Sequence, residues 1–214
     1  MNTEKKYILG LDVSTTCIGI ALFEDLGDKG KLCVLEHVAP KIKVKNITKT
    51  EELFMKANMF YDEFLGKYTN FGIIKVIIEE PLLRSNNVNT VATLLRFNGI
   101  LSKMIYDKLN IVPEYMSSYD SRKYAFPELM GKKDVDSKGK KLTEAAFKKK
   151  ELTLFGAYPK DADKKMIIWE KVADMEPQIQ WLYNKKKELM KENLDMSDAY
   201  VVAKSSMKKN GYWK

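Results

Sequence analysis

The sequence is poor in the side chains that serve soft-metal sites and nucleophilic catalysis. Its 214 residues include only two cysteines, Cys17 and Cys33, and a single histidine, His37. Two thiols and one imidazole are too few ligands for a zinc site, and one histidine offers little for a Ser-His-Asp triad. We expect both thiols to be reduced and mostly buried, and His37 to be structural or on the surface.

Long apolar runs are also lacking. No stretch approaches the roughly 18 apolar residues of a membrane span, and the apolar run after Lys5 and Lys6 is too short for a signal peptide. We therefore expect no membrane contact and a cytoplasmic location. Hydrophobic residues still make up 45% of the chain, which is enough for a sizeable core.

Negative charge is in the minority. Lysine and arginine number 37 against 29 acidic residues, for a formal net charge of +8. This excess favours an anionic partner such as nucleic acid, although solvated lysine faces would give the same count.

Hydrophobic patterning predicts alternating strands and helices. Apolar runs indicate strands at Tyr7–Val13, Cys17–Phe23, Lys31–Val38, Ile73–Glu79 and Ile111–Met116. Helical spacing indicates helices at Thr48–Leu65, Asn89–Lys108 and Leu194–Lys208, with a capping box formed by Thr48 and Glu51. This order predicts an α/β fold: a mixed central sheet, whose first three strands are antiparallel, with helices on both faces. We expect one domain over residues 1–214, with a Lys-rich insert around 131–150 that leads into a helix near Phe147.

Four acidic residues stand where apolar elements end or begin. Asp12 and Glu79 each end an apolar strand, and Asp195 and Asp198 lie one turn apart on one face of the last helix. Singly, Asp12 also fits a turn and Asp195 a helix N-cap. Together, such oxygen ligands suit Mg²⁺ or Mn²⁺, and a pair of these ions can hydrolyse a phosphodiester.

Three segments in order resemble the RuvC family of Holliday junction resolvases, within the ribonuclease H-like superfamily. They are Gly10-Leu11-Asp12 followed by TTCIGIAL, then VIIEE, then DMSDAYVVA, and the similarity runs from about Tyr7 to Ala203. The resemblance implies a divalent-metal-dependent endonuclease that cuts four-way DNA junctions as a homodimer in a bacterium or a phage-infected host cell. Actin-like kinases share the first segment alone.

The resemblance also assigns residues. It implies that Asp12, Glu79, Asp195 and Asp198 bind two metal ions per site, with Glu79 preferred to its neighbour Glu80. It places positively charged catalytic residues near the scissile phosphate at Arg122 and Lys164, and the adjacent Lys123 and Lys165 are alternatives that contact DNA. Among the lysine clusters, Lys148 and Lys149 are further candidate phosphate contacts.

The chain departs from the family pattern in three places. Val13-Ser14 stands where the family often has Pro-Gly, Leu82 stands where some members carry an aromatic that stacks on unpaired bases, and residues 131–150 are longer than a compact member needs. The family builds its dimer with a helix that corresponds to Asn89–Lys108, where Leu94, Leu95, Leu101 and Ile105 offer apolar surface. The same apolar face also fits an ordinary core helix.

Other functions stay open from the sequence. A related nuclease could act on other branched DNA or on RNA, and the same fold could bind nucleic acid without catalysis. An actin-like kinase needs two lobes and well over roughly 300 residues, so this chain is too short.

Overall fold

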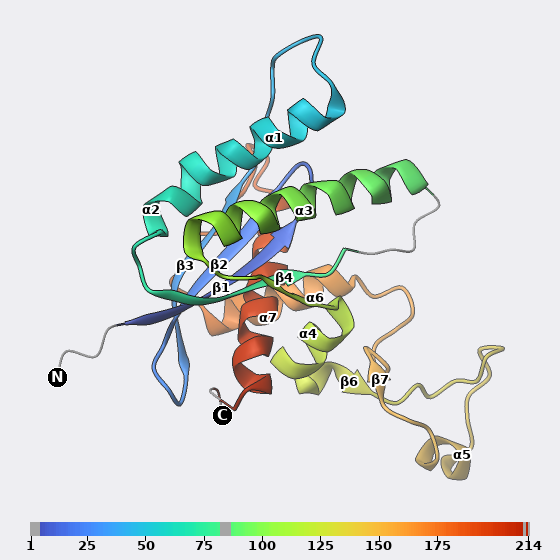
Figure 1. Ribbon diagram of the computed structural model, residues 1–214. Helices are drawn as coiled ribbons and strands as arrows, with labels where there is room; N and C mark the ends of the chain where they lie inside the picture. The colour runs from blue at the N-terminus through green and yellow to red at the C-terminus, as the bar shows by residue number, and fades with distance from the viewer. Residues whose placement is uncertain (1–4, 82–86, 212, 214) are drawn as a thin grey trace.

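A five-stranded mixed sheet forms the centre of the molecule (Figure 1). The computed structural model describes residues 5–81, 87–211 and 213. The strands are β1 (Lys6–Val13), β2 (Ile18–Asp25), β3 (Gly30–Val38), β4 (Ile73–Glu79) and β5 (Glu114–Met116), in the order β3-β2-β1-β4-β5. The first three strands are antiparallel, and β4 and β5 continue the sheet in parallel. The mixed sheet predicted from the sequence is confirmed.

Alternation along β1 assigns one set of side chains to each face of the sheet. Leu9, Leu11 and Val13 pack in the core beneath α1 (Lys49–Phe60) and α3 (Val88–Leu109). A π-helical turn (Tyr61–Leu65) and α2 (Gly66–Tyr68) extend α1. The predicted capping box of α1 is present, because Thr48 and Glu51 exchange side-chain and backbone hydrogen bonds.

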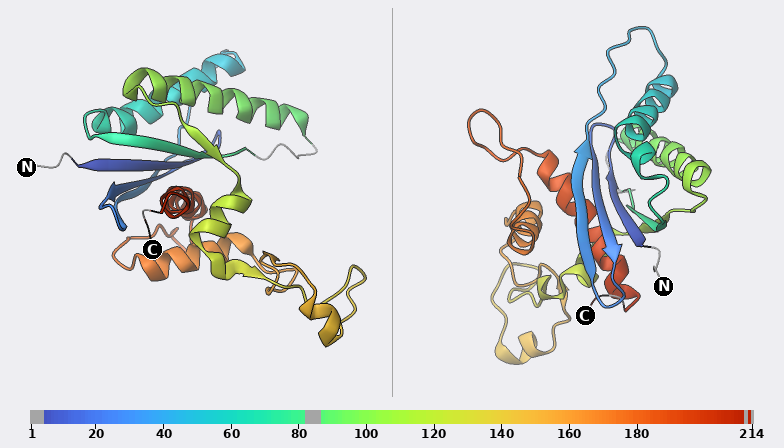
Figure 2. Two further views of the ribbon diagram at one scale, coloured as in Figure 1. Left: turned by 60° about the horizontal axis from the view of Figure 1, so that its bottom comes forward. Right: turned by 90° about the vertical axis from the view of Figure 1, so that its left-hand side faces the viewer.

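The opposite face is covered by α7 (Glu192–Lys209), with α4 (Ser118–Ala125) and α6 (Lys164–Met175) outside it (Figure 2). Buried residues of α7, among them Ala199 and Ala203, pack on Ile8, Ala21 and Ile77 of the sheet. Helices therefore cover both faces, as expected, and α7 is the helix that lies against the sheet on the side to which Asp12 belongs.

Several details differ from the sequence prediction. Strand β5 begins only at Glu114, because Pro113 has no N–H for the ladder. Helices α4 and α6 were not predicted from the sequence. Helix α4 lies between Met116 and the Lys-rich insert, and α6 lies between that insert and the last helix. Cys17 is buried, but the expectation of burial was wrong for Cys33, which is exposed. Cys33 is the extra residue of a bulge, since Leu22 pairs with Val34 and Phe23 with Leu32.

The Lys-rich segment forms a projection that we call the arm, residues 130–154. It starts at β6 (Met130–Gly131), passes through α5 (Glu144–Lys148) and returns at β7 (Thr153–Leu154), which pairs with β6. In Figures 1 and 2 the arm extends away from the helical layers, with α5 at its far end.

Helix α3 does not offer all of the surface that the sequence suggested for a dimer. Leu101 and Ile105 are fully buried against the sheet, so they belong to the core rather than to an interface. Leu95 is 44% exposed, and Leu94 is half-buried. Across the described ranges, no helix is both long and apolar enough to cross a membrane.

One buried lysine gives a prediction about stability. Lys204 on α7 is 3% exposed, and its ammonium lies 4.4 Å from the ring centre of Phe126 and 5.2 Å from that of Trp213. Burial lowers the pKa of Lys204 from 10.5 to about 8, and the nearby Lys208 charge adds to this. The charged form therefore costs the folded state free energy below pH 8, and that cost disappears as the pH rises towards 10.5.

We expect Lys204→Met to raise the free energy of unfolding by about 1–3 kcal/mol at pH 7, because the apolar chain keeps the packing and removes the buried charge. The loss of the cation–π contacts keeps the gain below the full penalty. Urea unfolding at pH 7 and near pH 10 measures it: the gain should shrink at the higher pH. Lys209→Met, at an exposed position of the same helix, is the control. A destabilised Lys204→Met protein at pH 7 would show that the cation–π contacts outweigh burial.

Candidate functional site

Parallel pairing of β1 with β4 brings Asp12 and Glu79 together. The register pairs Gly10 with Ile77 and Leu11 with Ile78, and Asp12 and Glu79 are the next residue on each strand. Both strands run in the same direction, so the two carboxylates lie side by side at one edge of the sheet, on the face that packs against α7.

Two glycines let the backbone of α7 approach this face closely. A Cβ on Gly19 would lie 2.0 Å from the carbonyl oxygen of Asp195, and one on Gly10 would lie 2.4 Å from that of Ala199. Gly19 pairs with Asp12 across β1 and β2. The absence of a side chain at Gly19 is therefore what places Asp195 beside Asp12.

The start of α7 is held by Asn193 rather than by a cap. The amide of Asn193 donates to the Leu182 and Met190 carbonyls and accepts from the Leu182 N–H. Because α7 begins at Glu192, Asp195 lies within its first turn, so the N-cap alternative for Asp195 was wrong. Asp198 follows one turn later and is 3% exposed.

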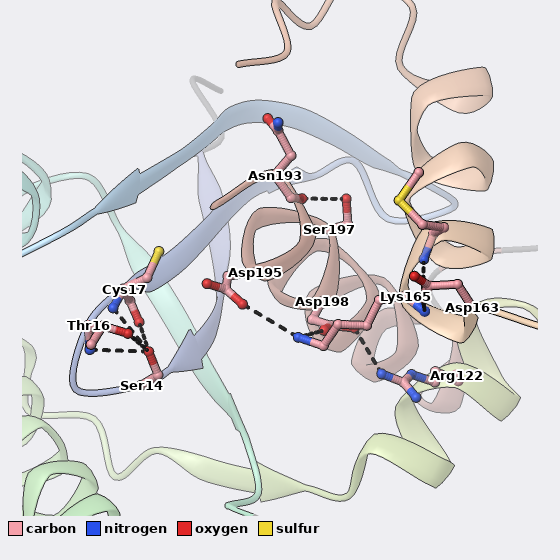
Figure 3. A network of polar contacts seen from close by, with 11 residues as sticks. Ser14, Thr16, Cys17, Arg122, Asp163, Lys165, Asn193, Asp195, Ser197 and Asp198 are labelled. Carbon is pink, nitrogen blue, oxygen red and sulfur yellow. Dashed lines mark hydrogen bonds and ion pairs between the residues drawn. The ribbon is translucent and has the colours of Figure 1, made fainter. Parts of the chain in front are cut away.

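Two cations meet these acids from neighbouring helices (Figure 3). Arg122 of α4 donates from Nη2 to Asp198 at 3.2 Å. The Lys165 ammonium, at the start of α6, lies 3.1 Å from Asp198 and 3.5 Å from Asp195. The carboxylates of α7 are thus joined to both helices that lie outside it.

The other basic candidates lie elsewhere. Lys164, the first choice from the resemblance, has its ammonium 5.9 Å from the ring centre of Phe155, and the adjacent alternative Lys165 reaches the acids instead. Lys123 is exposed and lies over the Tyr124 ring. Lys148 and Lys149 are exposed on the arm.

Burial and neighbouring negative charges disfavour the ionised forms of Asp12 and Glu79. Burial, and then the charges of Glu79, Asp198 and Asp195, hold the pKa of Asp12 well above its usual value. Burial and the Asp198 charge raise the pKa of Glu79 to about 7, although Arg122 and Lys165 oppose this rise. Burial acts to lower the pKa of Lys165, but the carboxylates of Asp198 and Asp12 outweigh it and raise that pKa. The charges of the acids therefore act on one another, and a further bound cation would stabilise their ionised forms.

The turn between β1 and β2 borders the same cluster. The Ser14 hydroxyl accepts from the Cys17 N–H at 3.0 Å and donates to the Cys17 carbonyl, and the buried Lys56 ammonium donates to the Thr15 carbonyl at 2.8 Å. This fixes the polar turn to α1. The buried Cys17 thiol has a raised pKa, caused by burial and then by the Asp195 charge, so it is a poor nucleophile.

Neighbouring candidates are separated from the cluster. Glu80 lines a different, polar pocket together with Glu114 and Asp120. His37 lies on β3, two strands away from Asp12. Leu82, at the position of the family's stacking aromatic, lies outside the described residues.

The donor set suits a hard divalent cation in kind and in charge. The charges of Asp195 and Asp198 help to raise the pKa of both Asp12 and Glu79, and carboxylate oxygens are the ligands that Mg²⁺ and Mn²⁺ prefer. Among the described residues, no three His, Cys, Asp or Glu side chains are arranged so that they could hold one metal ion. Asp198 is instead paired with Arg122 and Lys165, and Asp195 with Lys165.

The sequence contained an unused signal for α6. Asp163 caps this helix by accepting from the Lys165 and Met166 N–H groups, and Ile168 and Val172 follow at helical spacing. Reading this pattern as a helix would have put Lys164 and Lys165 on different faces, where only one of them can meet α7.

The fold and the edge cluster define a ribonuclease H-like α/β protein with acids from β1, β4 and α7. Holliday junction resolvases share this fold. RuvC of T. thermophilus in complex with a Holliday junction substrate aligns with a TM-score of 0.57 and 10% identity, over 97% of each chain. A second Thermus thermophilus RuvC structure gives 0.51 and 14%, over 93% of this chain and 92% of that one.

The yeast mitochondrial Holliday junction resolvase gives a TM-score of 0.55 and 11% identity, over 96% of this chain and 79% of that chain. At such identities the likeness establishes the fold alone. No protein-family model and no curated protein matches the sequence.

Proposed function

We propose that this protein is a divalent-metal-dependent DNA endonuclease that resolves four-way junctions by paired phosphodiester hydrolysis. The observation that carries the proposal is the gathering of Asp12, Glu79, Asp195 and Asp198, from three elements, at one edge of the sheet. The shared fold with a RuvC bound to a Holliday junction supports the choice of substrate.

Each side chain of the cluster has a role in this proposal. Asp12, Glu79, Asp195 and Asp198 would hold two Mg²⁺ or Mn²⁺ ions, which would activate water and stabilise negative charge on the leaving oxygen. Arg122 and Lys165 would hold the scissile phosphate against these acids. Arg122 has an unused hydrogen-bond donor for this role, because its buried Nε has no hydrogen-bond partner among the described residues.

Junction resolution also implies a homodimer in this proposal. Two symmetric cuts need two sites related by a dyad, and one site per protomer supplies them. The exposed Leu95 of α3 is the candidate contact, since Leu101 and Ile105 are committed to the core.

Two alternatives define the outcomes of the test. A ribonuclease H-like nuclease would use the same acids on flaps or on RNA, whereas a non-catalytic nucleic-acid-binding module would have no use for four acids that repel one another. The acids favour an enzyme, and the choice of substrate decides between the two nucleases.

The deciding experiment compares labelled four-way junction, flap, linear duplex and RNA–DNA hybrid with Mg²⁺ or Mn²⁺ and with excess chelator. We expect two symmetric cuts in the junction, at least about tenfold slower cutting of linear duplex, and no cutting in chelator. Faster cutting of the flap or the hybrid than of the junction would replace the resolvase with the related nuclease. Full activity in chelator would remove the metal mechanism.

A further inference from the structure

The arm carries much of the positive charge of the chain. Residues 130–154 contain eight lysines and four acidic residues. The lysines are Lys132, Lys133, Lys138, Lys140, Lys141, Lys148, Lys149 and Lys150. The arm thus contributes a net charge of +4, half of the +8 of the whole protein.

Two of the four acids of the arm are engaged within it. Asp136 accepts hydrogen bonds from the backbone N–H groups of Lys138 and Lys140, which shapes the turn at residues 136–141. Glu144 pairs with Lys148 one helical turn away. The ammonium groups of Lys138, Lys140 and Lys141 form no ion pair within the described residues and are exposed, so this turn presents unbalanced positive charge.

The base of the arm is connected to the carboxylate cluster. Along the chain, the arm lies between α4, which carries Arg122, and α6, which carries Lys165. At the base, the Phe155 N–H donates to the Leu129 carbonyl, and Phe155 is buried with both helices in one core. A ligand bound to the arm would therefore have a defined position relative to Arg122 and Lys165.

The chemistry of the arm matches phosphates better than bases. It has eight lysines but one aromatic side chain, Phe147, and the Lys132 ammonium lies 5.9 Å from the centre of that ring, so the arm offers little surface for stacking bases. Lysines are point charges that contact phosphate oxygens without reading sequence.

We propose that the arm binds the sugar–phosphate backbone of a DNA duplex that extends from the branch point, and so orients the branched substrate at the carboxylate cluster. This inference rests on the proposed endonuclease function. It also makes a claim of its own, that the lysine-bearing turn of the arm at residues 136–141 is a duplex-binding surface away from the acids.

A second hairpin in the chain provides a matched control. Around Tyr183–Leu189, Asn184 accepts from the backbone N–H groups of Lys186 and Glu188, as Asp136 does in the arm, and Lys185, Lys186 and Lys187 are exposed. The triple variant Lys138→Gln, Lys140→Gln, Lys141→Gln can thus be compared with Lys185→Gln, Lys186→Gln, Lys187→Gln. Both remove three positive charges from a turn built in the same way.

The measurement is the dissociation constant for linear duplex, four-way junction and single strand over a range of salt, with chelator to prevent cutting. The arm triple should bind duplex and junction about tenfold or more weakly at moderate salt, and its log–log salt slope should fall by roughly 2–3, about 0.9 per lost phosphate contact. The control triple should change much less.

Equal losses in the two triples would show dependence on net charge alone and overturn the inference, as would a loss confined to single strand. The parent protein separates this result from the proposed function. If the parent cuts no substrate, and only the arm triple binds duplex more weakly than the parent, the endonuclease proposal fails and the arm proposal stands. If it cuts junctions while the two triples behave alike, the reverse holds.

Discussion

Asp12→Asn should abolish DNA cleavage and leave the affinity for DNA close to that of the parent protein. The substitution keeps the size of the side chain but removes a carboxylate charge from the acids that would bind a cation. Loss of several kcal/mol of charge stabilisation lowers the single-turnover rate by at least about a thousandfold. Affinity survives because phosphate contacts to lysines and arginines dominate it.

The rate is measured on the four-way junction with Mg²⁺, and affinity separately in chelator. Glu80→Gln is the matched control, because Glu80 is the neighbour of Glu79 and lines a separate pocket. It should keep the parent rate, whereas Glu79→Gln should behave like Asp12→Asn. Robust cutting by Asp12→Asn would mean that the cluster is not the catalytic site.

Gly19→Ala should destabilise the protein and disable the site together. The added Cβ would lie 2.0 Å from the carbonyl oxygen of Asp195, and that atom is backbone, so α7 or β2 has to move. Overpacking of this kind costs about 1–3 kcal/mol. A displacement of about 1 Å at the acids can lower the catalytic rate by about a hundredfold.

Urea unfolding and the junction-cutting rate, measured on the fraction that remains folded, check both effects. Gly99→Ala is the control: Gly99 lies within α3 and has open space around its Cβ position, so alanine there should stabilise the helix by about 0.5–1 kcal/mol. If Gly19→Ala is as stable and active as the parent, the tight contact between β2 and α7 does not set the position of Asp195.

Much of the sheet was predictable because apolar runs report local burial directly. Strand β4 ends at Glu79 and strand β1 one residue beyond Asp12, as the sequence indicated, and Asp198 lies one turn after Asp195 on the last helix. Helix α4 escaped prediction because SYDSRKYA has no continuous apolar stripe, and only Ser121 and Ala125 are buried. Its stability comes from packing on α7, which a local pattern does not contain.

The choice between Lys164 and Lys165 could not be made from the sequence for a similar reason. Adjacent residues on a helix point about 100° apart, and the rotation of α6 is set by burial of Ile168 and Val172. Cys33 illustrates a second limit, because a single-residue bulge in an edge strand changes which side chain faces solvent.

The paired base of the arm makes it a removable module. Because Met130 pairs with Leu154, and Gly131 with Thr153, the chain leaves and re-enters the body at adjacent points. Residues between them can be lengthened, shortened or exchanged without changing the span that α4 and α6 must bridge. Changes in the length of the arm can therefore alter how far it projects from the body while the geometry of the acids stays the same.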